Sequence, residues 1–195
     1  IYPLAFQGLP ALGALHLQHN HLTNVPSQAL HGLETLQLLD LSRNHFTQLS
    51  PRDLSDLNVS RIRISGNQDL VLINVAAFSD LPETRSIEID GNGGLVYIDR
   101  RAFVGVERLE RLSLRDNKLV ALEPEVMLGL PQLKQLDLAG NPWQCGCHWQ
   151  RLHNFMSIRR QHITVSNGST ITCSPPQSVS DNSLKPSLLL PNISS

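Results

Sequence analysis

The three cysteines lie in the last third of the chain and are the residues best suited to covalent or metal chemistry. Cys145 and Cys147 are separated by one residue and precede His148, whereas Cys173 stands apart. Cysteine and histidine together could bind zinc, but this spacing is not that of a zinc finger. Cys147 and His148 could also pair as nucleophile and base, but sequence neighbours rarely share a catalytic geometry. We predict neither chemistry.

Histidines and one glycine-rich acidic segment could bind ions. His21 and His45 occupy corresponding positions in two consecutive, similar segments. There they could bind a metal together, or repel each other when both are protonated near pH 6. A tolerated surface position is the simpler interpretation, and it also covers His16 and His19. The segment from Asp90 to Gly94 resembles a calcium loop but lacks the acidic ligand at the twelfth position. We predict no metal and no cofactor.

Composition excludes several classes of protein. The chain has 195 residues and a net charge of -1, which argues against nucleic-acid binding. The sequence contains no run of 18 apolar residues, the length that a membrane-spanning helix needs. No nucleophile elbow, phosphate loop or zinc-binding H-E-x-x-H helix is present, so we do not expect an enzyme. Leucine is in excess, with 34 residues.

The leucines fall into a repeat of about 24 residues. Leu12-x-x-Leu15-x-Leu17-x-x-Asn20-x-Leu22 recurs from Leu36, Val59, Thr84, Leu109 and Leu133. This is the leucine-rich repeat. Leu15 and Leu17 alternate with outward residues, which predicts a short strand. Because one repeat cannot bury its apolar face alone, we expect stacked repeats with a curved parallel sheet on the concave side and an irregular or short helical convex side.

The turn after each strand carries an asparagine, which we expect to bond backbone groups of its own and the neighbouring repeat. The ladder consists of Asn20, Asn44, Asn67, Asn92, Asn117 and Asn141. In the third and fourth repeats one extra residue follows the asparagine. We expect a small bulge there, repeated in register.

The outward strand residues predict a polar concave face without aromatic rings. This suits a protein partner recognised by charge better than a sugar or a lipid. The candidate ligand-binding residues are His16, Asp40, Arg61, Arg63, Glu88, Asp90, Arg111 and Arg115. Each of them could instead be merely solvated.

The segment after Asn141 resembles the cysteine-rich C-terminal cap of extracellular leucine-rich repeat proteins. It begins Asn141-Pro-Trp-Gln-Cys145-Gly-Cys147, continues into an amphipathic stretch and reaches Cys173-Ser-Pro-Pro. The resemblance implies a right-handed α/β solenoid closed by a disulfide-linked cap, with Cys145 bonded to Cys173. The family's fourth cysteine would fall at or just beyond Ser195. Cys147 is therefore a free thiol, or it pairs with the usual partner of Cys145, or truncation has separated it from its own partner.

The expected domains are a partial repeat at 1–11, repeats at 12–140 and the cap at 141–195. Residues 1–11 match only the back half of a repeat. We therefore expect the chain to be part of a longer protein, with Leu15 and Leu17 at an open edge. A closed polar cap built from residues 1–11 would contradict this expectation.

A disulfide-linked cap requires an oxidising compartment, so we expect an extracellular protein. Three N-x-S sequons, at Asn58, Asn167 and Asn192, are compatible with secretion and glycosylation. The resemblance implies ligand recognition or adhesion, as part of a cell-surface receptor or adhesion protein. The alternative is a secreted structural or spacer protein of the extracellular matrix. The expected partner is a protein ligand or another cell-surface protein, with self-association left open and membrane contact only through a segment outside this chain.

Overall fold

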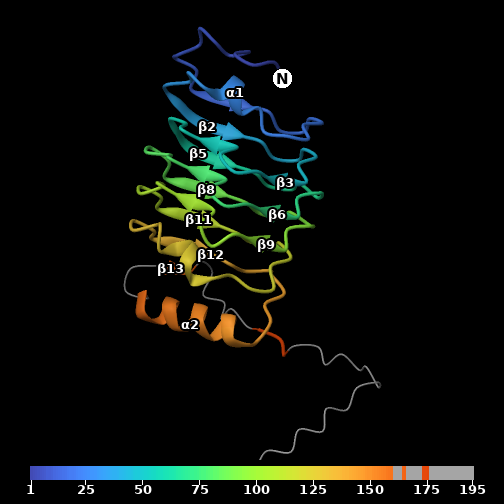
Figure 1. The fold of residues 1–195 in the computed structure, drawn as a ribbon, viewed down its shortest axis with the longest axis vertical. Helices are drawn as coiled ribbons and strands as arrows, with labels where there is room; N and C mark the ends of the chain where they lie inside the picture. Colours follow the sequence, from blue (N-terminus) through green and yellow to red (C-terminus); the bar gives the residue numbers. More distant parts are fainter. Residues whose placement is uncertain (160–163, 166–172, 176–195) are drawn as a thin grey trace, which may run out of the picture.

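The chain winds into a column of stacked coils in the computed structural model, which describes residues 1–159, 164–165 and 173–175 (Figure 1). The coils contribute strands to a seven-stranded parallel sheet with the order β1-β2-β5-β8-β11-β12-β13. Its strands are β1 (Ala14–His16), β2 (Leu36–Asp40), β5 (Val59–Arg63), β8 (Ser86–Glu88), β11 (Arg111–Ser113), β12 (Gln135–Asp137) and β13 (Thr164–Val165). The predicted solenoid is confirmed.

The strands of this sheet form where apolar and outward residues alternate. Leu39, Ile62, Ile87 and Leu112 lie in register on neighbouring strands, and all four are buried. Burying one such side chain contributes roughly 1.5–3 kcal/mol. The stack of inward residues is therefore the core, and it exists only because each coil covers the next.

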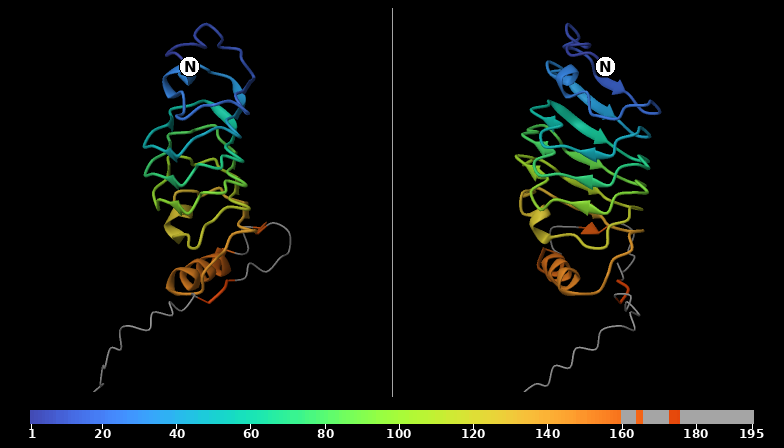
Figure 2. Two further views of the ribbon diagram at one scale, coloured as in Figure 1. Left: turned by 90° about the vertical axis from the view of Figure 1, so that its right-hand side faces the viewer. Right: turned by 45° about the vertical axis from the view of Figure 1, so that its right-hand side comes forward.

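The convex side of the middle coils consists of two three-stranded parallel sheets, which the sequence does not predict. They are formed by β3 (Gln48–Leu49), β6 (Leu72–Ile73) and β9 (Tyr97–Ile98), and by β4 (Leu54–Ser55), β7 (Phe78–Ser79) and β10 (Phe103–Val104). The rings of Phe78 and Phe103 stack with centroids 4.9 Å apart. Because strands on both sides share a spacing of about 4.8 Å, the middle coils stack with nearly parallel planes (Figure 2).

Helical turns on the convex side of the described repeats occur only in the flanking coils. They are α1 (Ser27–Leu30) and the 3-10 helix η1 (Pro124–Met127). Proline at the first position of η1 favours a helical start, because its missing N–H has no partner there in any case. The expected short helices are thus present at both ends of the repeats, and strands replace them between.

The accepting half of the predicted asparagine ladder runs through the middle coils, whereas the amide nitrogen of Asn92 has no partner among the described residues. The backbone N–H of Asn67 donates to Oδ1 of Asn92 at 2.9 Å, and that of Asn92 donates to Oδ1 of Asn117 at 2.9 Å. The amide of Asn117 donates in turn to the carbonyls of Leu114 and Ile89, both at 2.7 Å. The amide of Asn20 is exposed and bonds only carbonyls of its own coil.

The residue before each ladder asparagine has a left-handed backbone. Its φ lies between 54° and 72° at His19, Arg43, Gly66, Gly91, Asp116 and Gly140. This conformation costs a residue with a Cβ roughly 1–2 kcal/mol, whereas glycine adopts it freely. Glycine therefore recurs at this position wherever the sequence does not need a side chain.

The extra residue of the third and fourth repeats forms matching turns. Leu70 N–H donates to the carbonyl of Asn67 at 3.2 Å, and Leu95 N–H donates to that of Asn92 at 3.1 Å. A Cβ on Gly94 would lie 2.9 Å from the carbonyl oxygens of Gln68 and Leu70. The two turns stack in register so closely that only glycine fits, as the expected repeated bulge requires.

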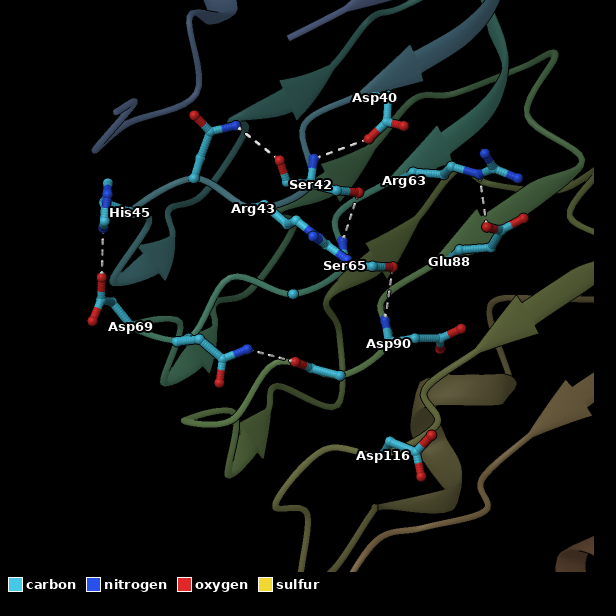
Figure 3. A pocket seen from close by; sticks show the side chains of 14 residues that line it. Asp40, Ser42, Arg43, His45, Arg63, Ser65, Asp69, Glu88, Asp90 and Asp116 are labelled. Atoms are coloured by element: carbon cyan, nitrogen blue, oxygen red, sulfur yellow. Dashed lines mark hydrogen bonds and ion pairs between the residues drawn. The ribbon is translucent and has the colours of Figure 1, made fainter. Parts of the chain in front are cut away.

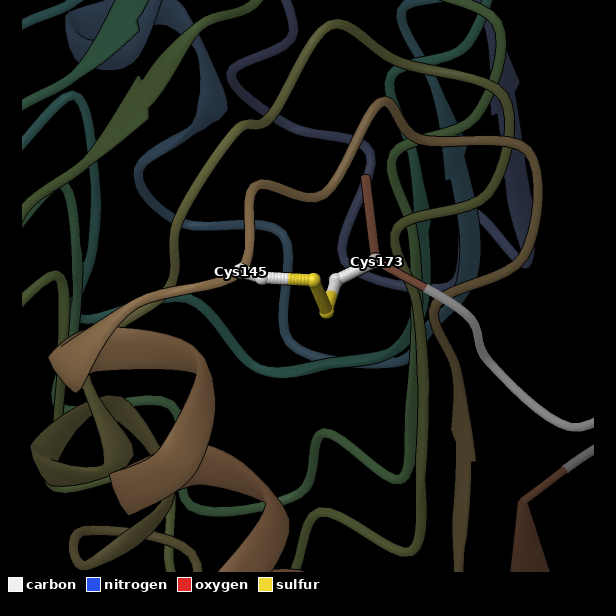
Figure 4. Close-up of a disulfide and its surroundings, with 2 residues drawn as sticks. All are labelled: Cys145 and Cys173. Carbon is white, nitrogen blue, oxygen red and sulfur yellow. A yellow bond between two sulfur atoms is a disulfide. The ribbon is translucent and has the colours of Figure 1, made fainter. Parts of the chain in front are cut away.

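The C-terminal cap packs against the last repeat. Trp143 is buried and donates its indole N–H to the carbonyl of Leu138 at 3.0 Å. Helix α2 (Cys147–Arg159) contacts η1 and buries Leu152. The predicted disulfide between Cys145 and Cys173 is present (Figure 4). Cys147 is a free, exposed thiol.

Residues 1–11 form successive turns, and they do not build a closed polar cap. Four large apolar residues among them, Ile1, Tyr2, Leu4 and Leu9, are about half or more exposed. Leu15 is nevertheless largely buried, and Leu17 is partly buried.

Removing one ladder amide should cost far more in a middle coil than at the first. Asn117→Ala removes the partners of the Ile89 carbonyl and of the N–H of Asn92, whereas the Leu114 carbonyl keeps the amide of Asn141, so we expect the free energy of unfolding to fall by more than about 2 kcal/mol. Asn20→Ala, at an exposed site, is the matched control and should cost less than about 1 kcal/mol. Urea unfolding followed by circular dichroism measures both, and equal losses would contradict the ladder's role.

Candidate functional site

The predicted binding residues all lie on the face of the seven-stranded sheet or in the turns that follow its strands. We keep the name concave face for this surface. The strand residues are His16 on β1, Asp40 on β2, Arg61 and Arg63 on β5, Glu88 on β8 and Arg111 on β11, and the turn residues are Asp90 and Arg115. Parallel pairing places Asp40, Arg63 and Glu88 side by side.

A groove of about 940 Å³ crosses the carboxyl ends of β2, β5 and β8 (Figure 3). It brings together four of the predicted residues, Asp40, Arg63, Glu88 and Asp90. His16, Arg61, Arg111 and Arg115 do not line it. Arg111 instead lines a neighbouring hollow of about 240 Å³ that also contains Glu88 and Asp90.

One ion pair spans the floor of the groove. Nε of Arg63 lies 2.8 Å from Oε2 of Glu88 on the next strand. Both side chains are about one-third exposed, so the pair contributes little to stability. Its main effect is to hold the two side chains in one arrangement, in which their charges neutralise each other.

Asp40 and Asp90 are carboxylates that no described cation neutralises with an ion pair. Asp40 is only 9% exposed, and its Oδ1 accepts the N–H of Ser42 at 3.0 Å. Asp90 accepts the hydroxyl of Ser113 at 2.7 Å and the N–H of Arg115 at 3.0 Å. Burial, followed by the charges of Glu88 and Asp137, raises the pKa of the Asp90 carboxyl despite these bonds.

Two serines that the sequence did not single out hold the wall of the groove together. The hydroxyl of Ser42 accepts the N–H of Ser65 at 3.1 Å, and the hydroxyl of Ser65 accepts the N–H of Asp90 at 3.2 Å. The only sequence signal was that serine recurs at the same outward position of two consecutive repeats.

The rim of the groove contains a pair of stacked histidines. The rings of His21 and His45 lie 5.5 Å apart, and Nδ1 of His45 lies 3.0 Å from Oδ2 of Asp69. Among the residues that the structure describes, no three His, Cys, Asp or Glu side chains are grouped to hold a metal. Asn92 of the suspected calcium loop is buried in the ladder.

The groove as a whole is acidic. Five carboxylates and two guanidinium groups line it, which gives a net charge of -3 while His45 is neutral. The acidic residues are Asp40, Asp69, Glu88, Asp90 and Asp116, and the basic ones are Arg43 and Arg63. Such a surface attracts cationic side chains of a partner and repels anionic ones.

The opposite edge of the concave face is basic. Arg61 and Arg111 flank Ser86 in register, both are exposed, and neither forms an ion pair with another described residue. Strand residues two positions apart point to the same face about 7 Å from each other. The row Arg61, Ser86 and Arg111 therefore lies about 7 Å from the row Arg63, Glu88 and Ser113 on the same face.

One predicted glycosylation site, Asn58, is described by the structure and lies outside this face. Asn58 is exposed directly before β5, and its Nδ2 donates to the carbonyl of Glu34 at 2.7 Å. Amide glycosylation would leave one Nδ2 hydrogen for this bond. The sequons at Asn167 and Asn192 fall outside the described residues.

Within the described part of the chain, no helix has the length and hydrophobicity to cross a membrane.

Comparisons with known proteins agree with this architecture. The family model described as "Leucine rich repeat" matches residues 10–68 and 82–142. The phospholipase A2 inhibitor of Gloydius brevicaudus siniticus is 40% identical over 76 residues, 38% of this chain and 22% of that protein. Podocan of Mus musculus is 32% identical over 166 residues, 72% of this chain and 26% of podocan. The chain thus spans only about a quarter of each relative.

Among solved structures, human 5T4 (Wnt-activated inhibitory factor 1, trophoblast glycoprotein) is similar over 81% of this chain and 89% of its own chain. The sequence identity is 17% and the TM-score is 0.48.

The raised pKa of Asp90 predicts how its substitution depends on pH. Because ionisation of this carboxyl disfavours the folded state, its favourable contribution is present below the ordinary value of 3.8 and lost as pH rises through the raised pKa. Asp90→Asn keeps an acceptor for Ser113 and Arg115 without the charge. Its free energy of unfolding, relative to the wild type, should therefore increase between about pH 3 and about pH 7. Chemical unfolding at several pH values measures this difference, and a constant or falling difference would contradict the assignment.

Proposed function

Since the chain belongs to the leucine-rich repeat family, we propose that it is an extracellular protein-binding module of a cell-surface receptor or adhesion protein. It recognises a protein ligand through the concave face. The observation that carries this proposal is the pairing of an acidic groove with a basic edge on one rigid sheet.

The chemistry of the face supports a protein as the ligand. Its outward columns contain no aromatic ring on which a sugar could stack, and charged side chains dominate the groove. A protein surface can present cations to the groove and anions to Arg61 and Arg111 at the same time. The name of one relative, a phospholipase A2 inhibitor, likewise describes a protein that acts on another protein.

The disulfide of the cap supports an extracellular location. Cys145 and Cys173 are joined, and such bonds persist in oxidising compartments. The use of the groove's charged residues also supports a binding role, because Arg63 and Glu88 pair with each other and Asp40 accepts a backbone N–H.

Reversing one charge of the basic edge should show whether the ligand binds to the concave face or to another part of the surface. The multimerised chain is applied to an array of cells that each display one secreted or cell-surface protein, and affinities are measured for every protein it binds. Arg61→Glu should weaken binding at least about ten-fold.

Arg101→Glu is the matched control for this experiment. Arg101 is also exposed and forms no described ion pair, but it lies on the convex side between β9 and β10. It should leave binding unchanged. A ligand that is lost with Arg101→Glu and retained with Arg61→Glu would place recognition elsewhere and overturn the proposal.

Secretion should modify Asn58. Protein expressed through the secretory pathway of mammalian cells should carry a glycan on this exposed amide, so Asn58→Gln should lower the intact mass by one glycan. Ligand binding should be unchanged, because Asn58 precedes β5 and does not line the groove. Peptide mass spectrometry decides the matter, and an unmodified Asn58 would contradict this prediction.

A further inference from the structure

A column of exposed valines runs along one flank of the solenoid. Val71, Val96 and Val120 occupy the same position in three consecutive coils and are 43%, 46% and 37% exposed. The N–H of Val96 donates to the carbonyl of Val71 at 3.0 Å, so these two valines are direct neighbours. Val120 follows in the next coil, whose Lys118 N–H donates to the carbonyl of Leu95 at 2.9 Å. The first two lie immediately before β6 and β9, on the right of Figure 1.

The core does not need these valines. In each coil the preceding leucine, Leu70, Leu95 or Leu119, already fills the interior and is buried. The ring of Tyr97, 53% exposed, widens the apolar strip beside Val96. Contiguous exposed apolar surface, unlike single scattered residues, is typical of interaction sites.

The column has definite ends and a charge pattern beside it. The corresponding positions in the flanking coils are Thr47 and Gln144, so the apolar strip stops there. In the adjacent column, Asp69, Gly94 and Lys118 precede the three buried leucines. Opposite charges thus stand at the two ends, with a glycine between them. No described residue forms an ion pair with Lys118, and Asp69 contacts only His45 among the described ion-pair partners.

We propose that this valine column is the interface of a homodimer in which two copies pack antiparallel about a two-fold axis through Val96. The axis sets Val96 against Val96 and sets Val71 of each copy against Val120 of the other. Asp69 of each copy then faces Lys118 of the other, and Gly94 leaves the centre unobstructed.

The charge pattern favours a second copy over an unrelated partner. A two-fold interface requires that the surface be complementary to itself when reversed. The two-fold axis through Val96 exchanges Val71 with Val120, so valine meets valine. It also exchanges Asp69 with Lys118, so two ion pairs form between the copies. A parallel arrangement would set Asp69 against Asp69 and Lys118 against Lys118, which is repulsive.

The dimer should be weak. Three coils span only about 10 Å along the column, so the buried area is small compared with a standard interface of about 800 Å² per partner. The valines themselves do not line the groove, whereas Asp69 lines it and so belongs to both surfaces. Val96→Asp therefore changes the dimer interface without touching the groove.

Sedimentation velocity of the purified chain over a concentration series tests the interface. The wild type should show a concentration-dependent dimer, and Val96→Asp should weaken it at least about ten-fold. Val104→Asp is the matched control, because Val104 is 44% exposed on β10 and outside the column. It should leave association unchanged. Thermal unfolding should confirm that both variants fold.

Charge exchange tests the antiparallel arrangement itself. Asp69→Lys and Lys118→Asp should each weaken the homodimer, because each variant sets like charges together. An equimolar mixture of the two should restore association, since every facing pair is then a lysine with a carboxylate. High salt should reduce this recovery.

Three outcomes would overturn the proposal. They are a wild-type chain that stays monomeric at every concentration, a dimer that Val96→Asp leaves intact, and a mixture of the charge variants that associates no better than either alone. Binding of a different protein that requires Val96, in a monomeric chain, would assign the column to that partner instead.

Discussion

A coil of this solenoid turns a corner after its strand, and there its peptide groups have no strand or helix with which to pair. Leaving such groups buried without partners would cost more than the folded state gains from any single leucine. Asn92 supplies an acceptor and Asn117 supplies both an acceptor and a donor, and each side chain bonds the neighbouring coil. The rest of the architecture follows, because a side chain that bonds two coils fixes their register and brings their leucines into one stack.

The same register arranges the charges of the concave face. Every outward residue stands beside its counterpart in the next coil, so the sequence of one column becomes a row of functional groups on the surface. Arg63 and Glu88 neutralise each other in this way. Asp40 stands beside Arg63, but that guanidinium bonds Glu88 instead. Asp90 accepts the Ser113 hydroxyl and the N–H of Arg115 and forms no described ion pair.

The strands, the ladder and the core could be predicted from sequence because each is encoded by a repeated residue type at a fixed position. The disulfide could be predicted only from resemblance, since the cysteines lie 28 residues apart and nothing in their spacing selects a pair. The convex sheets were missed because strands of two residues, such as Leu72–Ile73, are too short to show alternation. The groove was missed because its depth depends on packing, which buries Asp40 although it occupies an outward position.

The predicted binding residues share one face of the sheet, but the sequence did not show which of them line a common groove. Four of the eight predicted residues line the groove, and the others surround it. Asp69 and Arg43 line it as well, but they belong to turns whose direction depends on a left-handed residue. A pattern of apolar residues carries no information about where such a turn directs its side chains.

The contact of Gly94 with the carbonyls of the preceding turn limits which substitutions the fourth repeat tolerates. Any side chain there would meet backbone atoms, which cannot move aside as the end of a flexible side chain could. The lengthened turns also meet short turns, through Val71 on one side and Lys118 on the other, and keep their backbone hydrogen bonds. A change of turn length between neighbouring coils is thus tolerated at places where a single added methyl group is not.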